Sequence, residues 1–321
     1  MDLILASADG TEERFLEEDF DMDFGKTNDF VLYTSYGTWA GDIQIGKKIY
    51  IPGTEYGGII KDIKSATNTD KIDVKGFAWR GYLAKRIIVP PAGKDYYIGE
   101  GELNDIIRGM VNIPGFVVST EPSVNVRYQF KRYVNVAEGL QAMCQSVGYR
   151  LDLKYIQTQE GGYVLVQAVP AGEYGDTVEY SQDSMIDFMS EDNQMGVNHL
   201  ICLGKGELKD RTVIHLYADA DGNISQTQSI FGLDEIVQTF ENSGAEDETL
   251  LETGTSKLKE LLSSKSFTAN VKTIDSELFL GDTVSGTDYI TGNSVTKPIV
   301  DKIVKRTSGV ISINYKIEGE K

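Results

Sequence analysis

The sequence is poor in the residues that carry most protein chemistry and cross-linking. Its 321 residues include two cysteines, two histidines and seven prolines. Cys144 and Cys202 lie far apart in apolar contexts and without metal-ligand spacing. We therefore expect two buried free thiols, with a disulfide as the alternative.

Long apolar runs are also missing, and we expect no secretory leader. No apolar stretch approaches the ~18 residues that a membrane-spanning helix needs. Leu3–Ala6 is too short for a secretory signal, and an acidic run from Glu12 to Asp23 follows it. We expect a chain without a membrane anchor that is made and folded in a cytoplasm.

Positive charge is scarce. Lysine and arginine number 31 against 49 acidic residues, which gives a formal net charge of −18. Because duplex DNA and anionic lipid are polyanions, this balance argues against both as binding partners. An acidic wall could still let nucleic acid slide past without sticking, although solubility is the simpler explanation.

Glycine and strand-forming residues are abundant. The 33 glycines and the many tyrosines, threonines and valines favour strands joined by turns. The length predicts two or three domains. Met1–Pro91 has the pattern of an antiparallel β-domain, 92–175 that of a small α+β unit, and 176–321 that of strands with one helix at about 247–263. The predicted class is α+β and rich in strands.

Apolar periodicity places two helices in the middle segment. One is Glu102–Val111, and the other is Asn135–Val147 with Asn135 as its N-cap and Gly148 as its stop. The closing part, Ser266–Lys321, reads as a barrel-like β unit with few reactive side chains. It has a corner at Gly281-Asp282, a turn at Thr291–Asn293, and strands at Lys297–Lys305 and Val310–Ile317.

His199 and His215 fall in two strand patterns that we expect to be neighbours. They could form a metal pair, but no third histidine or cysteine has suitable spacing, so satisfied sheet or core positions are the simpler prediction. Asp219, Asp221 and Asn223 resemble the start of a calcium loop. Position 230 is Ile230 where such a loop needs a glutamate, so a hairpin turn is predicted instead.

No catalytic motif is recognisable. The sequence has no nucleophile elbow, phosphate-binding loop or zinc-protease motif, and no Asp/Glu pair is marked among its many carboxylates. We therefore expect no catalytic, cofactor-binding or metal-binding residues. The cluster Lys131-Arg132-Tyr133, with Arg127 and Tyr128 upstream, is predicted to be a solvated strand face or a dock for an acidic neighbouring subunit.

Three phrases of the chain carry a resemblance to a known family. They are Asp73–Pro91 (DVKGFAWRGYLAKRIIVPP), Gly204–Tyr217 (GKGELKDRTVIHLY) and Leu280–Val284 (LGDTV). Together they resemble the hub-type tail proteins of siphoviruses and prophages of Gram-positive bacteria, which are similar to the baseplate hub proteins of contractile phages and tailocins. The resemblance extends over nearly the whole chain.

The resemblance implies a structural role without enzyme activity. Such hubs carry two tube-like antiparallel β-barrel domains, here 1–91 and 176–321, that flank a lateral α+β domain, here 92–175. Three chains form a pseudo-sixfold ring that joins the tail tube to the spike or tip and the surrounding baseplate, in a virion tail or a phage-like particle.

The expected partners are the chain itself, the tail tube protein, the spike or tip protein, other baseplate proteins and a tape measure protein. DNA would pass through the lumen without specific binding. Because the sequence stops just after the second barrel, a cell-wall hydrolase is expected to be a separate protein.

Two other functions stay open at this point. One is a cell-wall-degrading tail enzyme that uses an Asp/Glu pair. The other is a host-binding tail protein that presents Tyr96, Tyr97 and Tyr174 on a sugar-binding face.

Overall fold

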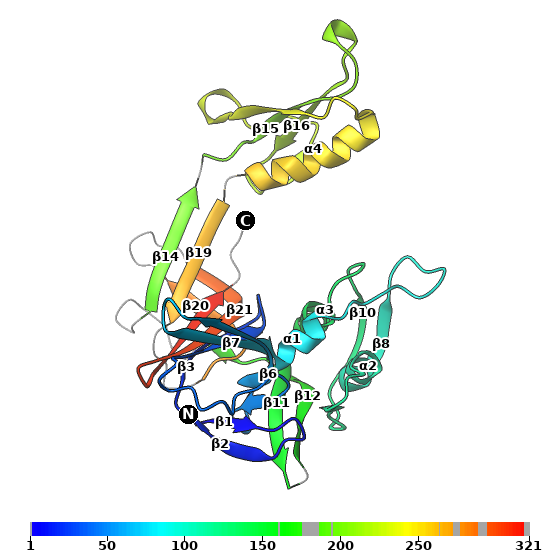
Figure 1. Cartoon of the computed structure of the whole chain (residues 1–321). Coiled ribbons are helices and arrows are strands. Elements are labelled where there is room, and N and C mark those ends of the chain that lie inside the picture. The colour runs from blue at the N-terminus through cyan, green and yellow to red at the C-terminus, as the bar shows by residue number, and fades with distance from the viewer. Residues whose placement is uncertain are drawn as a thin grey trace. The chain divides into compact units, whose positions relative to one another are not determined.

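The computed structural model describes residues 2–159, 161–174, 186–193, 195–262, 264–271, 277–287 and 294–317. Two compact units are present: unit 1 is Met1–Asp187 with Ala269–Glu318, and unit 2 is Phe188–Thr268. Strands β14 (Ile186–Asn193) and β19 (Ser264–Val271) pair with each other where the chain leaves and re-enters unit 1 (Figure 1). Strands dominate and helices are few, so the predicted α+β, strand-rich class is confirmed.

Unit 1 is built on an eleven-stranded sheet with the order β13-β20-β21-β3-β4-β7-β6-β5-β1-β2, to which β22 adds beside β21. Its strands are β1 (Leu3–Ala6), β2 (Glu12–Leu16), β3 (Asp19–Phe24), β4 (Asp29–Thr34), β5 (Lys48–Tyr50), β6 (Gly57–Ala66), β7 (Lys71–Ala78), β13 (Glu173–Tyr174), β20 (Thr283–Thr287), β21 (Ser294–Thr307) and β22 (Val310–Ile317). Strand β3 shows why the sheet forms: Phe20, Met22 and Phe24 are buried, while the aspartates between them face the other way.

The middle of unit 1 packs helices with two small sheets, β10-β8 and β11-β12-β9. Its helices are α1 (Trp79–Ala84), α2 (Leu103–Met110) and α3 (Val136–Gln145), and its strands are β8 (Ile98–Glu102), β9 (Phe116–Val118), β10 (Asn125–Gln129), β11 (Tyr149–Thr158) and β12 (Gly161–Pro170). The rings of Tyr50 and Trp79 lie 4.1 and 5.1 Å from that of Tyr155. The first two predicted segments therefore share one hydrophobic core.

Unit 2 is a four-stranded sheet covered by one helix. The strands β15 (His199–Leu203), β16 (Val213–Ala218), β17 (Ile224–Ser225) and β18 (Val237–Glu241) lie in the order β17-β16-β15-β18. Helix α4 (Asp247–Leu261) buries Leu250, Gly254 and Leu258. A methyl group on Gly254 would lie 2.5 Å from Cys202 Sγ, so only glycine lets the helix approach this closely.

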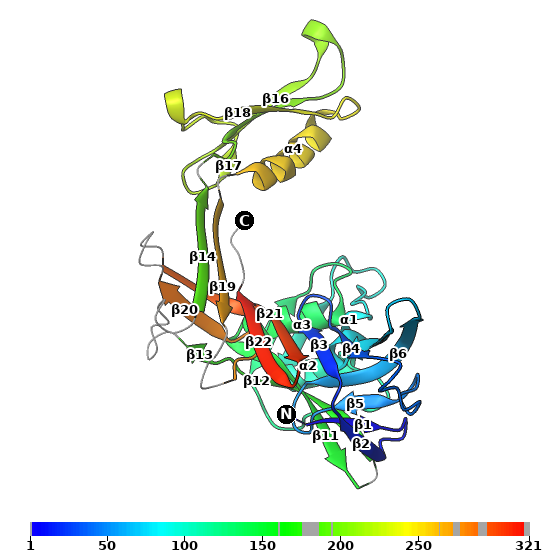
Figure 2. The ribbon, with the colours of Figure 1, turned by 60° about the vertical axis from the view of Figure 1, so that its left-hand side comes forward.

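The compact units differ from the predicted three segments. Strand β21 pairs with β3 from Lys302 opposite Phe24 to Arg306 opposite Phe20, and with β22 on its other side (Figure 2). The closing strands therefore complete the sheet of unit 1, whereas 188–268 forms a unit of its own. The predicted turn at Thr291–Asn293 lies outside the described residues. Among the described residues, no helix is long and apolar enough to cross a membrane.

Candidate functional sites

The two histidines meet on the sheet of unit 2, as predicted from their strand patterns. His199 on β15 and His215 on β16 approach with 2.8 Å between Nε2 and Nδ1. On the other side, Nδ1 of His199 lies 2.7 Å from an oxygen of Glu235. In the neutral tautomer of His199 that donates its Nδ1 proton to the carboxylate of Glu235, Nε2 of His199 is an acceptor for the Nδ1 proton of His215.

This histidine cluster is a satisfied chain of hydrogen bonds. The ring of His199 also stacks on Tyr217 at 4.3 Å, and among the described residues no group of three His, Cys, Asp or Glu side chains could hold a metal ion. Glu235 was missed from the sequence. It reaches His199 because β18 pairs in parallel with β15, and short motifs do not encode a parallel register.

Asp219 builds a hairpin turn, as predicted. Its Oδ1 accepts the backbone N–H groups of Asp221 at 2.9 Å and Asn223 at 2.8 Å, and its Oδ2 accepts from the Asn223 side chain at 3.0 Å. These hydrogen bonds lower the pKa of Asp219, and the one from the Asn223 side chain has the largest effect. The carboxylate is thus used by the turn between β16 and β17.

The cysteines are buried free thiols, as predicted. Burial raises the pKa of Cys144 to about 12 and also raises the pKa of Cys202. Each thiol belongs to a different hydrophobic core, Cys144 in unit 1 and Cys202 in unit 2. Both are held in the protonated form, which is a poor nucleophile and metal ligand.

The predicted surface residues are exposed to different degrees. Lys131, Arg132 and Tyr133 are exposed, in a turn after β10 rather than on a strand. Tyr96 is 44% exposed, whereas Tyr97 is half-buried against Phe130 at a ring distance of 5.7 Å. Tyr174 is also half-buried. Only one of the three proposed sugar-binding tyrosines is therefore well exposed.

A buried charged junction connects the closing strands to the rest of unit 1, and it was not predicted from the sequence. Lys302 on β21 is fully buried and donates to Glu277 at 2.8 Å and to the carbonyl of Leu278 at 3.1 Å. Its ammonium group lies 4.8 Å from the ring of Tyr56, whose hydroxyl donates to the same carboxylate. Burial first, and then the charge of Glu277, raise the pKa of this tyrosine.

Open strand edges are the other conspicuous feature of the surface. Within the part of the chain that is described, β2, β22 and β18 each pair with one neighbour only. Each edge exposes an apolar residue: Phe15 is 64%, Val310 70% and Val237 49% exposed. Unpaired edges with apolar side chains are templates for association with another chain.

Known proteins resemble this chain in structure but not detectably in sequence. No protein-family model and no curated protein matches the sequence. Solved structures match in fold. The 43 kDa tail protein of prophage MuSo2 from Shewanella oneidensis is 14% identical, with a TM-score of 0.52 over 99% of this chain and 98% of that chain.

The baseplate of phage P2 in its activated conformation with Ca contains a second match. It is 9% identical, with a TM-score of 0.56 over 99% of this chain and 98% of that chain. A topological model of the p2 virion baseplate matches at 10% identity and a TM-score of 0.53, with the same coverage. This chain has the fold of a phage tail protein. The resemblance seen in the three sequence phrases is confirmed at the level of fold, and it extends over whole chains on both sides.

Proposed function

We propose that this chain is a structural component of the tail or baseplate of a phage or phage-derived particle. The observation that carries the proposal is the fold shared end to end with tail and baseplate proteins. In our proposal the chain forms a homotrimeric ring that joins the end of the tail tube to the spike or tip and to other baseplate proteins.

The architecture suits such a ring. Each chain contributes two sheet-bearing units, so three chains supply six, which is the number that a sixfold tube requires. The open edges of β2, β22 and β18 would be covered by neighbouring copies. Obligate contacts of this kind bury ~2,000 Å² or more.

The acidic surface suits a tail tube through which DNA passes without binding. A chain with a net charge of −18 repels a polyanion, so DNA or a tape measure protein would pass the lumen without specific binding. His199, His215 and Asp219 are engaged in structural hydrogen bonds, and both cysteines are buried, which supports a role without enzyme activity.

Native mass spectrometry of the purified full chain, with a peptidoglycan cleavage assay on the same sample, tests the proposal. We expect a particle of three chains of 35.5 kDa each and no release of peptidoglycan fragments. A stable monomer that cleaves peptidoglycan would contradict the proposal and favour the cell-wall enzyme.

A further inference from the structure

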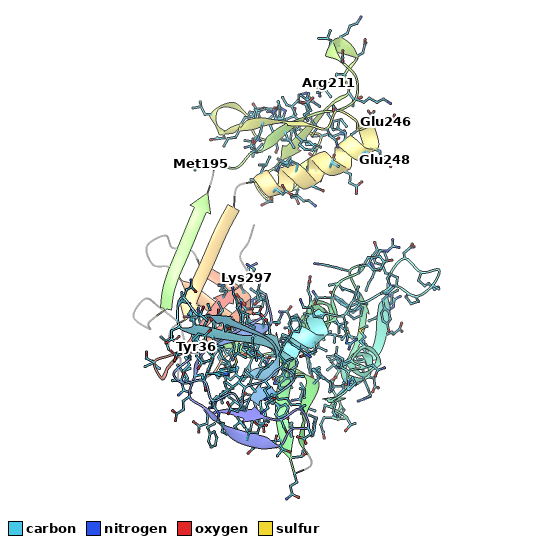
Figure 3. All side chains as sticks on the ribbon, in the orientation of Figure 1. Tyr36, Met195, Arg211, Glu246, Glu248 and Lys297 are labelled. Carbon is cyan, nitrogen blue, oxygen red and sulfur yellow. The ribbon has the colours of Figure 1, made fainter. Side chains whose placement is uncertain are left out.

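The loop between β15 and β16 presents a single apolar side chain at one end of unit 2. In this leucine tip, Gly204–Arg211, Leu208 is 94% exposed. Its backbone has a φ of 50°, a conformation that a branched side chain rarely adopts. Residues in such conformations cluster at active sites, ligand clamps and switch regions. The tip is anchored at both ends: Lys205 binds Glu246 at 2.9 Å, and Arg211 lies against Glu241 at 2.5 Å. Figure 3 labels Arg211 and Glu246 in unit 2.

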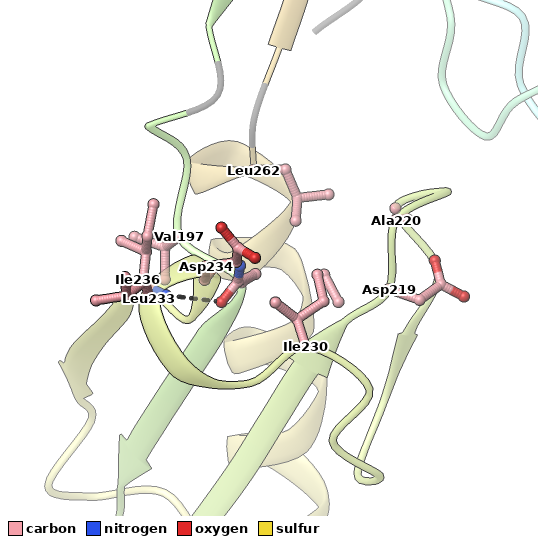
Figure 4. A pocket seen from close by; sticks show the side chains of 11 residues that line it. Val197, Asp219, Ala220, Ile230, Leu233, Asp234, Ile236 and Leu262 are labelled. Atoms are coloured by element: carbon pink, nitrogen blue, oxygen red, sulfur yellow. Dashed lines mark hydrogen bonds between the residues drawn. The ribbon is translucent and has the colours of Figure 1, made fainter.

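The opposite end of the same sheet carries a pocket of about 390 Å³, whose lining combines apolar side chains with Asn198 and two carboxylates. It lies where β15 and β18 begin and where β16 and α4 end, and Figure 4 shows Ile230, Leu233 and Leu262 around it. The other apolar lining residues are Val197, Ala218, Ala220 and Ile236. Leu233 is fully exposed at the pocket, and the next residue in the chain, Asp234, adds a carboxylate to its lining.

Charge distinguishes the two ends as well. The leucine tip holds three cations and two carboxylates, so its net charge is positive in a chain whose total is −18. The pocket lining contributes Asp219 and Asp234 and no cation. Within the described part of the chain, Lys209 makes no ion pair and neither does Asp234, so each is available to a partner.

We propose that the leucine tip of one copy of this chain inserts into this pocket of the next copy, with Leu208 as the anchor against the apolar lining and Lys209 beside Asp234. The occupant is a second copy because the positive tip and the acidic pocket are complementary in charge and every copy carries both. Since they lie at its opposite ends, the contact is head-to-tail and closes into a ring when the rotation between copies permits. This inference rests on the proposed trimer and names the contact that builds it.

Cysteine cross-linking on the full chain tests the contact. The variant Glu207→Cys with Ala220→Cys leaves Leu208 and Lys209 in place, and both native cysteines are fully buried. Treatment with a short bis-maleimide should give covalent trimers on a denaturing gel. The two single variants should give none, and neither should the matched pair Glu207→Cys with Lys94→Cys, whose second cysteine is exposed on unit 1. Products that stop at dimers would mean a symmetric contact and overturn the proposal.

Charge reversal supplies a second measurement. Lys209→Glu should weaken trimer formation roughly tenfold or more, and Lys209→Glu with Asp234→Lys should restore it. Lys94→Glu, the same change in unit 1, should have no effect. A trimer by mass that neither cross-links through the tip nor responds to the reversal would overturn this inference and leave the proposed function standing. A monomer in every sample would overturn both.

Discussion

Some residues in unit 1 have structural roles that their chemical type would not suggest. Lys302 is the clearest case, because a lysine is almost never fully buried unless it is paired. Here it has a carboxylate and a carbonyl as acceptors, and three aromatic rings lie 4.8 to 5.6 Å from its ammonium group. The junction joins a closing strand to the loop that carries Tyr56, so it holds together parts of unit 1 that are far apart in sequence.

Truncating this lysine should therefore destabilise unit 1. We expect Lys302→Ala to lower the free energy of unfolding by about 3 kcal/mol, because it removes both the charge and the buried stem. Lys302→Met keeps the stem and should lose less, about 1–2 kcal/mol, since Glu277 is partly exposed to water. Urea unfolding followed by tryptophan fluorescence measures this, because both tryptophans, Trp39 and Trp79, belong to unit 1. Equal stability of the alanine variant and the parent chain would refute the role given to Lys302.

The same junction predicts acid sensitivity. Burial alone would raise the pKa of Glu277, but the charge of Lys302 and the hydrogen bonds from Lys302 and Tyr56 lower it below its ordinary value of 4.5. The stabilisation is therefore fully present above pH 4.5 and is lost as the pH falls through the folded pKa. Burial raises the pKa of Asp301 above 3.8 and acts in the opposite direction. Comparing urea midpoints at about pH 6 and about pH 3 should show a smaller loss for Glu277→Gln than for the parent chain; identical losses would argue against the assignment.

At the scale of elements, the local signals in the sequence were reliable. Asn135 caps α3 by accepting the backbone N–H of Glu138 at 2.9 Å, and Gly148 has the positive φ of a helix stop. The predicted strand Val310–Ile317 is β22 without change, and the predicted strand 297–305 lies within β21. Glu102 was predicted as the first helical residue but is the N-cap of α2, because its carboxylate accepts the N–H of Asp105 at 2.8 Å.

Removal of the cap of α3 should cost a modest amount of stability. We expect Asn135→Ala to destabilise unit 1 by about 1 kcal/mol, and Asn135→Asp to be nearly neutral because aspartate caps equally well. Tryptophan-detected urea unfolding measures both variants. An alanine variant as stable as the aspartate variant would show that the hydrogen bond to Glu138 contributes nothing.

The corner at Gly281 should tolerate no side chain. Its φ is 92°, and an added Cβ would lie 2.2 Å from the Gln141 side chain and 2.9 Å from Arg150 Cβ. Gly41 has a φ of 77° with nothing within 4 Å, so it is a matched control for the backbone strain alone. We expect Gly281→Ala to destabilise unit 1 by about 1–3 kcal/mol more than Gly41→Ala. Equal effects in urea unfolding would mean that the corner is not tightly packed.

Long-range pairing limited what could be predicted. The antiparallel pairing of β21 with β3 joins residues almost three hundred positions apart, and the parallel pairing of β15 with β18 brings Glu235 to His199. Such registers depend on the whole fold rather than on local periodicity. The class, the helices and the hairpins were therefore accessible from the sequence, whereas the two compact units, the Lys302 junction and the contact of Glu235 with His199 were not.

For the whole molecule, the fold is the strongest support for the proposed function. Neither family models nor curated sequences match, yet the chain aligns from end to end with tail and baseplate proteins at 9 to 14% identity. A fold retained at this identity depends on burial patterns, such as the alternating aromatic and acidic residues of β3, rather than on individual side chains. What distinguishes this chain at the molecular scale is its surface: open edges, exposed apolar residues and a strong negative charge.

Electron microscopy of tail particles from cells that make this chain decides whether it forms the proposed ring. With the chain marked by a specific antibody, we expect a threefold ring at the end of the tail tube, with six sheet-bearing units around a continuous lumen. Unmarked particles, or particles that carry the chain as single copies away from the tube, would refute the proposal.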